Sequence, residues 1–118
     1  MQLSLLKSKL HMATVTQTEL TYHGSVSIPA DLVEEAGLFP HEKVLVANCQ
    51  TGQRGETYVL IGEPGTRQIQ LNGAMARLAQ PGDRVIIMAF ALMTPNEAKS
   101  HKPQVIVLDE ENRIIERI

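Results

Sequence analysis

The Gly24-Ser25 peptide bond joins two residues that could do chemistry on the chain itself. Glycine has no Cβ, so the Gly24 carbonyl can adopt conformations that other residues resist and can be approached closely by the Ser25 hydroxyl. If that hydroxyl adds to the carbonyl, the amide becomes an ester. Elimination and hydrolysis then release Gly24 as a carboxylate and leave a pyruvoyl group at position 25. Gly and Ser are also common turn residues, so an ordinary tight turn is the alternative interpretation.

Two basic side chains stand close together near the start of the chain. Lys9 and His11 are two residues apart, which puts both on the same face if this segment is a strand. They could share a site, or they could be an edge lysine and a surface imidazole. Farther along, Arg54 offers a planar fork that can bind a carboxylate through two hydrogen bonds, which the compact charge of a lysine cannot do.

Five segments, in this order and spacing, resemble the pyruvoyl-dependent aspartate 1-decarboxylases of bacterial pantothenate synthesis. The resemblance runs from about Leu5 to about Pro103 and implies a mainly β fold, a small six-stranded double-psi β-barrel with short helices. It also implies a homotetramer with active sites between neighbouring subunits. The segments are Lys9-Leu10-His11, Tyr22-His23-Gly24-Ser25, Gly52-Gln53-Arg54-Gly55-Glu56-Thr57-Tyr58, Asn72-Gly73-Ala74 and Gly82-Asp83.

The resemblance implies that the chain converts L-aspartate to β-alanine and CO2 for pantothenate and coenzyme A synthesis. Its cofactor would be the pyruvoyl group made from Ser25, which can form a Schiff base with the substrate amine and act as an electron sink. Self-cleavage would divide a single domain, residues 1–118, into a β chain of residues 1–24 and an α chain of residues 25–118. No pyridoxal phosphate and no metal is expected, and a maturation factor is an open possibility.

The family pattern also gives roles to individual residues. Tyr58 matches the proton donor, Thr57 would hydrogen-bond the Gly24 carbonyl during the acyl shift, and Asn72 would stabilise the oxyanion that develops. The implied catalytic residues are Gly24, Ser25, Thr57, Tyr58 and Asn72, and the implied substrate-binding residues are Lys9, His11, Arg54, Thr57, Gly73, Ala74 and Met75.

Two residues depart from the family pattern and leave other functions open. Met75 stands where many members have alanine, and we expect it to tune the pocket, because the contact there is made by backbone. Ala47 stands where some members have tryptophan, which leaves room near the substrate. These differences allow a decarboxylase of a related acidic amino acid. A non-catalytic double-psi barrel that is never cleaved and acts as a binding module is the remaining alternative.

Composition excludes several other classes. A chain of 118 residues favours one domain, and a net charge of −2 without a basic stripe argues against nucleic acid as a partner. The four histidines lack close metal-ligand spacing, and no nucleotide-binding glycine motif is present. The single cysteine, Cys49, is predicted to be a buried small hydrophobe in a reducing compartment. Without an evident signal peptide or a long apolar run, we expect a cytoplasmic protein with no membrane partner.

The elements that must position these residues are mostly strands. The run Arg84–Met93 is predicted to be a strand buried on both faces, residues 94–103 to be irregular, and the charged tail 109–118 to matter little to the chemistry. Short strands, frequent turns and two brief helices indicate a small β-barrel. The other expected strands are Val26–Ile28, Lys43–Cys49, Thr57–Ile61, Gln68–Leu71 and Gln104–Leu108, and the expected helices are Pro29–Leu38 and Met75–Ala79.

Overall fold

The computed structural model describes all residues from 1 to 118, and most of its regular structure is strand, which confirms the mainly β prediction. Three short helical segments interrupt the strands. The strands are β1 (Leu3–Thr14), β2 (Gln17–Glu19), β3 (Ser25–Pro29), β4 (Lys43–Asn48), β5 (Arg54–Gly62), β6 (Gln70–Asn72), β7 (Arg84–Met93), β8 (Gln104–Leu108) and β9 (Ile114–Arg117), and the helices are α1 (Ala30–Ala36), the 3-10 helix η1 (Gly73–Arg77) and α2 (Pro95–Ala98).

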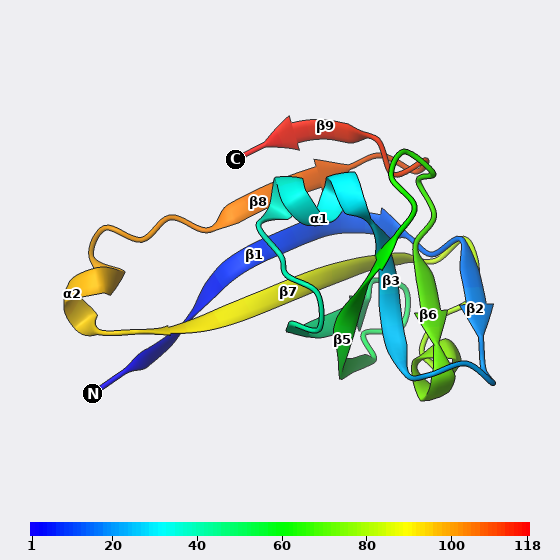
Figure 1. The fold of residues 1–118 in the computed structure, drawn as a ribbon, viewed down its shortest axis with the longest axis horizontal. Coiled ribbons are helices and arrows are strands. Elements are labelled where there is room, and N and C mark those ends of the chain that lie inside the picture. Colours follow the sequence, from blue (N-terminus) through cyan, green and yellow to red (C-terminus); the bar gives the residue numbers. More distant parts are fainter.

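All nine strands are hydrogen-bonded neighbours in one sheet, in the order β2-β6-β3-β5-β4-β7-β1-β8-β9. The family resemblance implied six strands, so the structure has more strands than expected, and the double-psi topology stays a prediction. The sheet bends strongly, because β2, β3, β5 and β6 run roughly across the direction of β1, β7 and β8 (Figure 1). Strands β1 and β7 pair in antiparallel fashion along most of their length.

Helix α1 ends where the sequence predicts. Leu32, Val33 and Ala36 are buried on one face, and Gly37 follows in the left-handed conformation, with φ +69. The backbone N–H groups of Gly37 and of the residue after it satisfy carbonyls of the last turn. Because α1 covers one side of the bent sheet, its apolar face closes the core (Figure 1).

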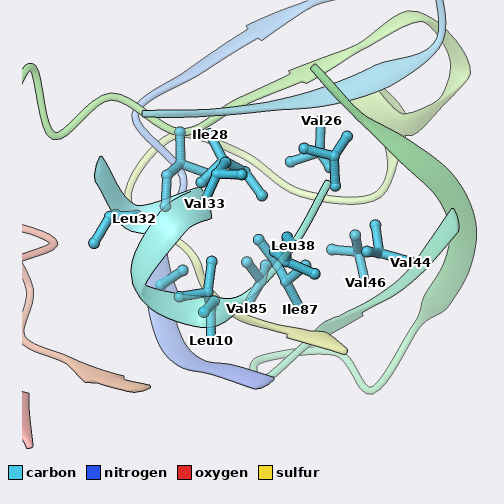
Figure 2. Packing of buried hydrophobic residues seen from close by; sticks show 14 of the residues in the cluster. Leu10, Val26, Ile28, Leu32, Val33, Leu38, Val44, Val46, Val85 and Ile87 are labelled. Atoms are coloured by element: carbon cyan, nitrogen blue, oxygen red, sulfur yellow. The ribbon is translucent and has the colours of Figure 1, made fainter. Parts of the chain in front are cut away.

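The hydrophobic core is one cluster that takes side chains from nearly every element. Leu10 of β1, Val26 of β3 and Ile87 of β7 lie at its centre with exposed fractions of 0%, 0% and 1%. Figure 2 shows these aliphatic side chains packed together with those of α1 and β4. No aromatic residue belongs to the cluster, as the low aromatic content of the chain leads one to expect.

Several predictions about elements need correction. Strand β7 is not buried on both faces, since burial alternates along it and Phe90 and Leu92 are exposed. The segment after it contains α2, which begins with a Thr94 and Glu97 capping box that the sequence pattern already carries. The tail includes β9, which pairs with β8. Cys49 is exposed at the end of β4.

Candidate active site

The Ser25 hydroxyl lies at the start of β3 and is held from two sides. Ser25 is fully buried, with 0% of its surface exposed. Its Oγ donates a hydrogen bond to the carbonyl oxygen of His23 (3.0 Å) and accepts one from Asn72 Nδ2 (2.9 Å). Ser25 and Asn72 are direct partners across the antiparallel pair of β3 and β6, so both side chains are on the same face. The structure therefore joins the two residues that the sequence assigned to the nucleophile and to the oxyanion donor.

Two further polar side chains fix Asn72. Its Nδ2 also donates to Ser27 Oγ (3.2 Å), and its Oδ1 accepts from Gln70 Nε2 (2.7 Å). Neither Ser27 nor Gln70 was predicted as a site residue. The available signal was the strand period of two, since Ser25 and Ser27, like Gln70 and Asn72, are spaced to share a face.

Gly73 lies against Gly24. A Cβ built on Gly73 would be 2.7 Å from both the Cα and the nitrogen of Gly24 and 3.1 Å from the Tyr22 carbonyl oxygen, and Gly73 has φ +66. Gly24 itself has no positive φ, and a Cβ built there would meet no atom within 4 Å. Gly24 therefore does not have the left-handed backbone that favours glycine, and the position with no room for a side chain is Gly73. The approach of the Ser25 hydroxyl to the Gly24 carbonyl stays a prediction.

Thr57 and Tyr58 lie on β5, the parallel neighbour of β3. Val26 pairs with Val59, so one residue earlier the same register sets Ser25 beside Tyr58. Ser25 and Tyr58 are both on the face of the sheet opposite the core residues Val26 and Val59. The Tyr58 ring lies 6.2 Å from the His41 ring, centre to centre, and neither its hydroxyl nor that of Thr57 makes a hydrogen bond within the chain. Both hydroxyls are thus available to a ligand.

Lys9 and His11 of β1 form a second group, and Arg54 of β5 lies on the same face of the sheet as they do. Lys9 pairs with Met88, and Ala47 pairs with both Ile86 and Arg54. The three polar residues consequently lie on the outer face of β1 and β5, across the small side chain of Ala47. Lys9 makes no hydrogen bond or ion pair, and Arg54 donates only to the Gly52 carbonyl oxygen (3.4 Å). Their charges are free for a carboxylate.

His11 has a lowered pKa. Burial, followed by the positive charges of Lys9 and Arg84, lowers the pKa of His11 below its ordinary value of 6.5. Its Nδ1 is buried and has no hydrogen-bond partner. The imidazole is therefore neutral at pH 7 and carries one unused polar atom.

The two groups are separated along the sheet. Strands β3, β5, β4, β7 and β1 follow one another, so four spacings lie between Ser25 and Lys9, or about 20 Å along the sheet. The side chains around Ser25 and those around Lys9 cannot both reach one small amino acid bound to a single chain if the path along this face is taken. The structure therefore places Lys9 and His11 away from Ser25, while Arg54 is on β5, the same strand as Thr57 and Tyr58.

Ala74 and Met75 continue η1 after Gly73. Ala74 is exposed and Met75 is half-buried. The Met75 sulfur would lie 3.3 Å from a Cβ built on Gly55, and its side chain packs against the core. Met75 therefore packs between Gly55 of β5 and the core.

Other kinds of site find little support in the structure. No three side chains of His, Cys, Asp or Glu are placed to hold a metal ion. No helix has the length and apolar character needed to cross a bilayer. The hollows on the surface are shallow. One of about 290 Å³ is lined by Lys43, Glu56, Thr57 and Tyr58. Tyr58 is the β5 neighbour of Ser25, so this hollow is near the cleavage site.

The chain matches a known protein family along almost its whole length and is similar to individual members of that family. The model of a family described as aspartate decarboxylase matches residues 1–115. The chain is 54% identical over 112 residues to the aspartate 1-decarboxylase of Chlorobium limicola, covering 95% of this chain and 88% of that one. It is 54% identical over 114 residues to that of Ruminiclostridium cellulolyticum, with 97% and 89% covered, and 50% identical over 115 residues to that of Maricaulis maris, with 98% and 95% covered.

Proposed function

This chain belongs to the aspartate decarboxylase family, and we propose that it cuts itself between Gly24 and Ser25 and then converts L-aspartate to β-alanine and CO2 for pantothenate and coenzyme A synthesis. The observation that carries the proposal is the buried Ser25 hydroxyl, held by Asn72 and by the His23 carbonyl next to the bond that must break. We also propose that the protein acts in the cytoplasm.

Self-cleavage proceeds in three balanced steps. Ser25 Oγ adds to the Gly24 carbonyl carbon, the carbon–nitrogen bond breaks, and the hydroxyl proton ends on the new amine of Ser25. Loss of the Ser25 Cα proton and expulsion of the Gly24 carboxylate then separate the chain into residues 1–24 and 25–118, with dehydroalanine at position 25. One water replaces the nitrogen and releases ammonia. The surroundings fit this chemistry, because the hydroxyl is oriented and Gly73 leaves no side chain between the two backbones.

The pyruvoyl group supplies a carbonyl that draws electrons from the substrate α-carbon, so that CO2 can leave. Side chains of the protein bind the substrate and transfer the proton. Arg54 binds a substrate carboxylate through its planar fork, and Lys9 adds a second positive charge. Tyr58, in the same row as Ser25, returns a proton to the α-carbon after CO2 has left.

The remaining predicted residues complete the pocket. Gly73, Ala74 and Met75 offer backbone N–H groups to the substrate, and His11 contributes a neutral imidazole beside Lys9. Thr57 hydrogen-bonds the Gly24 carbonyl during the acyl shift and later faces substrate. The side chain of Met75 packs against Gly55 on the core side of β5, so it affects the pocket only through the position of that strand.

Assembly into a homotetramer would unite the two groups of residues. We propose that Lys9 and His11 of one subunit face Ser25 of a neighbour, because about 20 Å of sheet separates them from Ser25 within one chain. A maturation factor is compatible with this arrangement, since Tyr22 and His23 beside the cleavage site are exposed.

A related acidic amino acid is the second candidate substrate. Ala47 is small and pairs directly with Arg54, which leaves room beside Arg54 for a longer or differently shaped acid. Turnover of aspartate, glutamate and cysteine sulfinate by the cleaved protein ranks the substrates. We expect aspartate to have the highest kcat/KM, and a higher value for either other acid would replace the assignment.

Ser25→Ala is the control for this experiment. The variant cannot form the pyruvoyl group, so it should neither cleave nor release CO2 from any of the three acids. β-Alanine formed by Ser25→Ala would contradict the proposed mechanism. An uncleaved and inactive parent chain would favour the binding module.

A further inference from the structure

A line of four hydrogen-bonding groups runs from β6 to the cleavage site. Gln70 Nε2 donates to Asn72 Oδ1 (2.7 Å), Asn72 Nδ2 donates to Ser25 Oγ (2.9 Å), and Ser25 Oγ donates to the His23 carbonyl oxygen (3.0 Å). Asn72 and Ser25 are both buried, and Gln70 is half-buried. Every donor in this line points the same way, towards the bond that is cut.

The two ends set the direction of the line. The His23 carbonyl can only accept, so Ser25 donates to it and must accept from Asn72. If Ser25 gave up its bond to the His23 carbonyl, however, its hydroxyl could donate to Asn72 instead. The hydroxyl of Ser27 can also donate or accept, so the two serines alone would allow the reversed Asn72 amide. At the other end, the Gln70 N–H group favours the orientation in which Oδ1 faces Gln70 and Nδ2 faces Ser25.

We propose that Gln70 is a positioning residue for self-cleavage, which holds the Asn72 amide so that its N–H group faces the Ser25 hydroxyl. The inference rests on the proposed function. If the Asn72 amide turned over, Ser25 would donate its proton to Oδ1. The Asn72 N–H group would then no longer face the Ser25 oxygen. It would be lost from the side of the bond where the Gly24 carbonyl oxygen gains negative charge as Oγ adds to the carbonyl carbon.

The test replaces the donor by an acceptor of the same shape. An ionised glutamate in Gln70→Glu can only accept, so it favours the reversed orientation of Asn72 at neutral pH, whereas a protonated glutamate can donate again. We expect Gln70→Glu to cleave about 100-fold more slowly than the parent at pH 7. The ratio of the two rates should recover as the pH is lowered from about 8 to about 5, as the carboxyl group gains its proton.

Two further variants separate orientation from charge and from folding. Gln70→Leu removes the donor without adding charge and should cleave slowly at every pH. Gln68→Glu adds the same charge on an exposed residue two positions earlier and should cleave like the parent. The full-length chains are made by cell-free synthesis in bacterial extract, the loss of intact mass is followed with time, and each variant's thermal midpoint is measured.

Each outcome has a distinct meaning. Slow cleavage by both position-70 variants, with recovery at low pH in Gln70→Glu alone, supports the positioning role. Parent-like cleavage by a folded Gln70→Leu, or a rate ratio for Gln70→Glu that does not change with pH, overturns it. A parent chain that does not cleave at all contradicts the proposed function instead.

Discussion

Gly73 has no room for a side chain while Gly24 stays in place. A Cβ would lie 2.7 Å from the Gly24 Cα, and backbone atoms cannot give way as the end of a flexible side chain can. We expect Gly73→Ala to displace the Gly24 carbonyl and to slow self-cleavage by at least about tenfold. The time course of intact mass measures this rate.

Gly65→Ala is the matched control for Gly73→Ala. Gly65 also has a positive φ, +76, but no atom lies within 4 Å of its Cβ position. Its substitution tests the cost of the backbone conformation without the close contact. If Gly65→Ala slowed cleavage as much as Gly73→Ala, the close approach to Gly24 would not be the cause.

Thr57 and Tyr58 should separate the making of the cofactor from its use. Thr57→Val removes a hydroxyl with little change in shape, so we expect a folded chain that stays uncleaved. Tyr58→Phe should cleave normally, because its hydroxyl is needed only after CO2 has left, yet it should produce β-alanine at least about 100-fold more slowly. Mass spectrometry and a β-alanine assay on the same samples make the comparison. Full activity in Tyr58→Phe would remove its role as proton donor.

Arg54 should contribute to substrate binding through the shape of its guanidinium group. Arg54→Lys keeps the charge but loses the fork, so we expect KM for aspartate to rise roughly tenfold or more. The exposed Arg113→Lys, far from the candidate site in sequence, is the control. An unchanged KM in Arg54→Lys would show that the carboxylate is bound elsewhere.

At the residue scale, the family pattern named Ser25 and Asn72, and the structure shows them hydrogen-bonded to each other. Their roles in the chemistry stay predictions. Gln70 was missed because a polar residue on a short strand is ordinary until its hydrogen bond to Asn72, two residues along the same strand, is known. The reason for glycine was assigned to position 24, whereas the steric demand falls on position 73, since close approach depends on tertiary structure.

The turn before β7 is tied to β4 through a carboxylate. Asp83 Oδ2 accepts hydrogen bonds from the Gln80 backbone N–H and from Asn48 Nδ2, each at 3.0 Å. These bonds, the backbone one foremost, lower the pKa of Asp83 below its ordinary value of 3.8. Because the folded chain holds this proton less tightly than the unfolded chain, the stabilisation is present above about pH 4 and is lost as the pH falls through the lowered pKa.

Asp83→Asn should therefore reduce stability at pH 7 and have less effect at pH 3. Urea unfolding of the parent and the variant at both pH values measures the difference. Glu110→Gln, at an exposed residue without a hydrogen bond or ion pair, should leave stability unchanged at both. A difference between parent and Asp83→Asn that grows at low pH would contradict the assigned role.

At the element scale, local signals were enough where the sequence carries its own ends. Helix α1 has a buried apolar face and a glycine directly after it, and both were readable. Strand β5 begins at Arg54, earlier than expected, because pairing with β4 extends it through residues of low strand propensity. Strand β9 was missed because it depends on pairing with β8, a contact that no local pattern reports.

Within one chain, the predicted substrate-binding residues Lys9 and His11 lie about 20 Å from Ser25 along one face of the sheet. If neighbouring subunits share each site, Ser25→Ala and Lys9→Ala should complement each other. Each variant alone should be inactive or nearly so. Under random mixing of equal amounts, about one site in four receives both intact residues from different chains, so activity should return.

Complementation is measured by producing the two variants together and assaying β-alanine per subunit. Ser25→Ala produced together with the double variant Ser25→Ala, Lys9→Ala is the control, since no chain then supplies Ser25. No recovery in folded mixed assemblies would place all site residues within one chain, and the proposed sharing between subunits would fail.

The intact mass of the protein under denaturing conditions tests the central claim most directly, because it needs no substrate. Self-cleavage predicts two chains, 24 and 94 residues long from a precursor of 118, and the larger one lighter by one ammonia than a chain that starts with serine. A single intact chain that stays unchanged after incubation with bacterial cell extract would contradict the account.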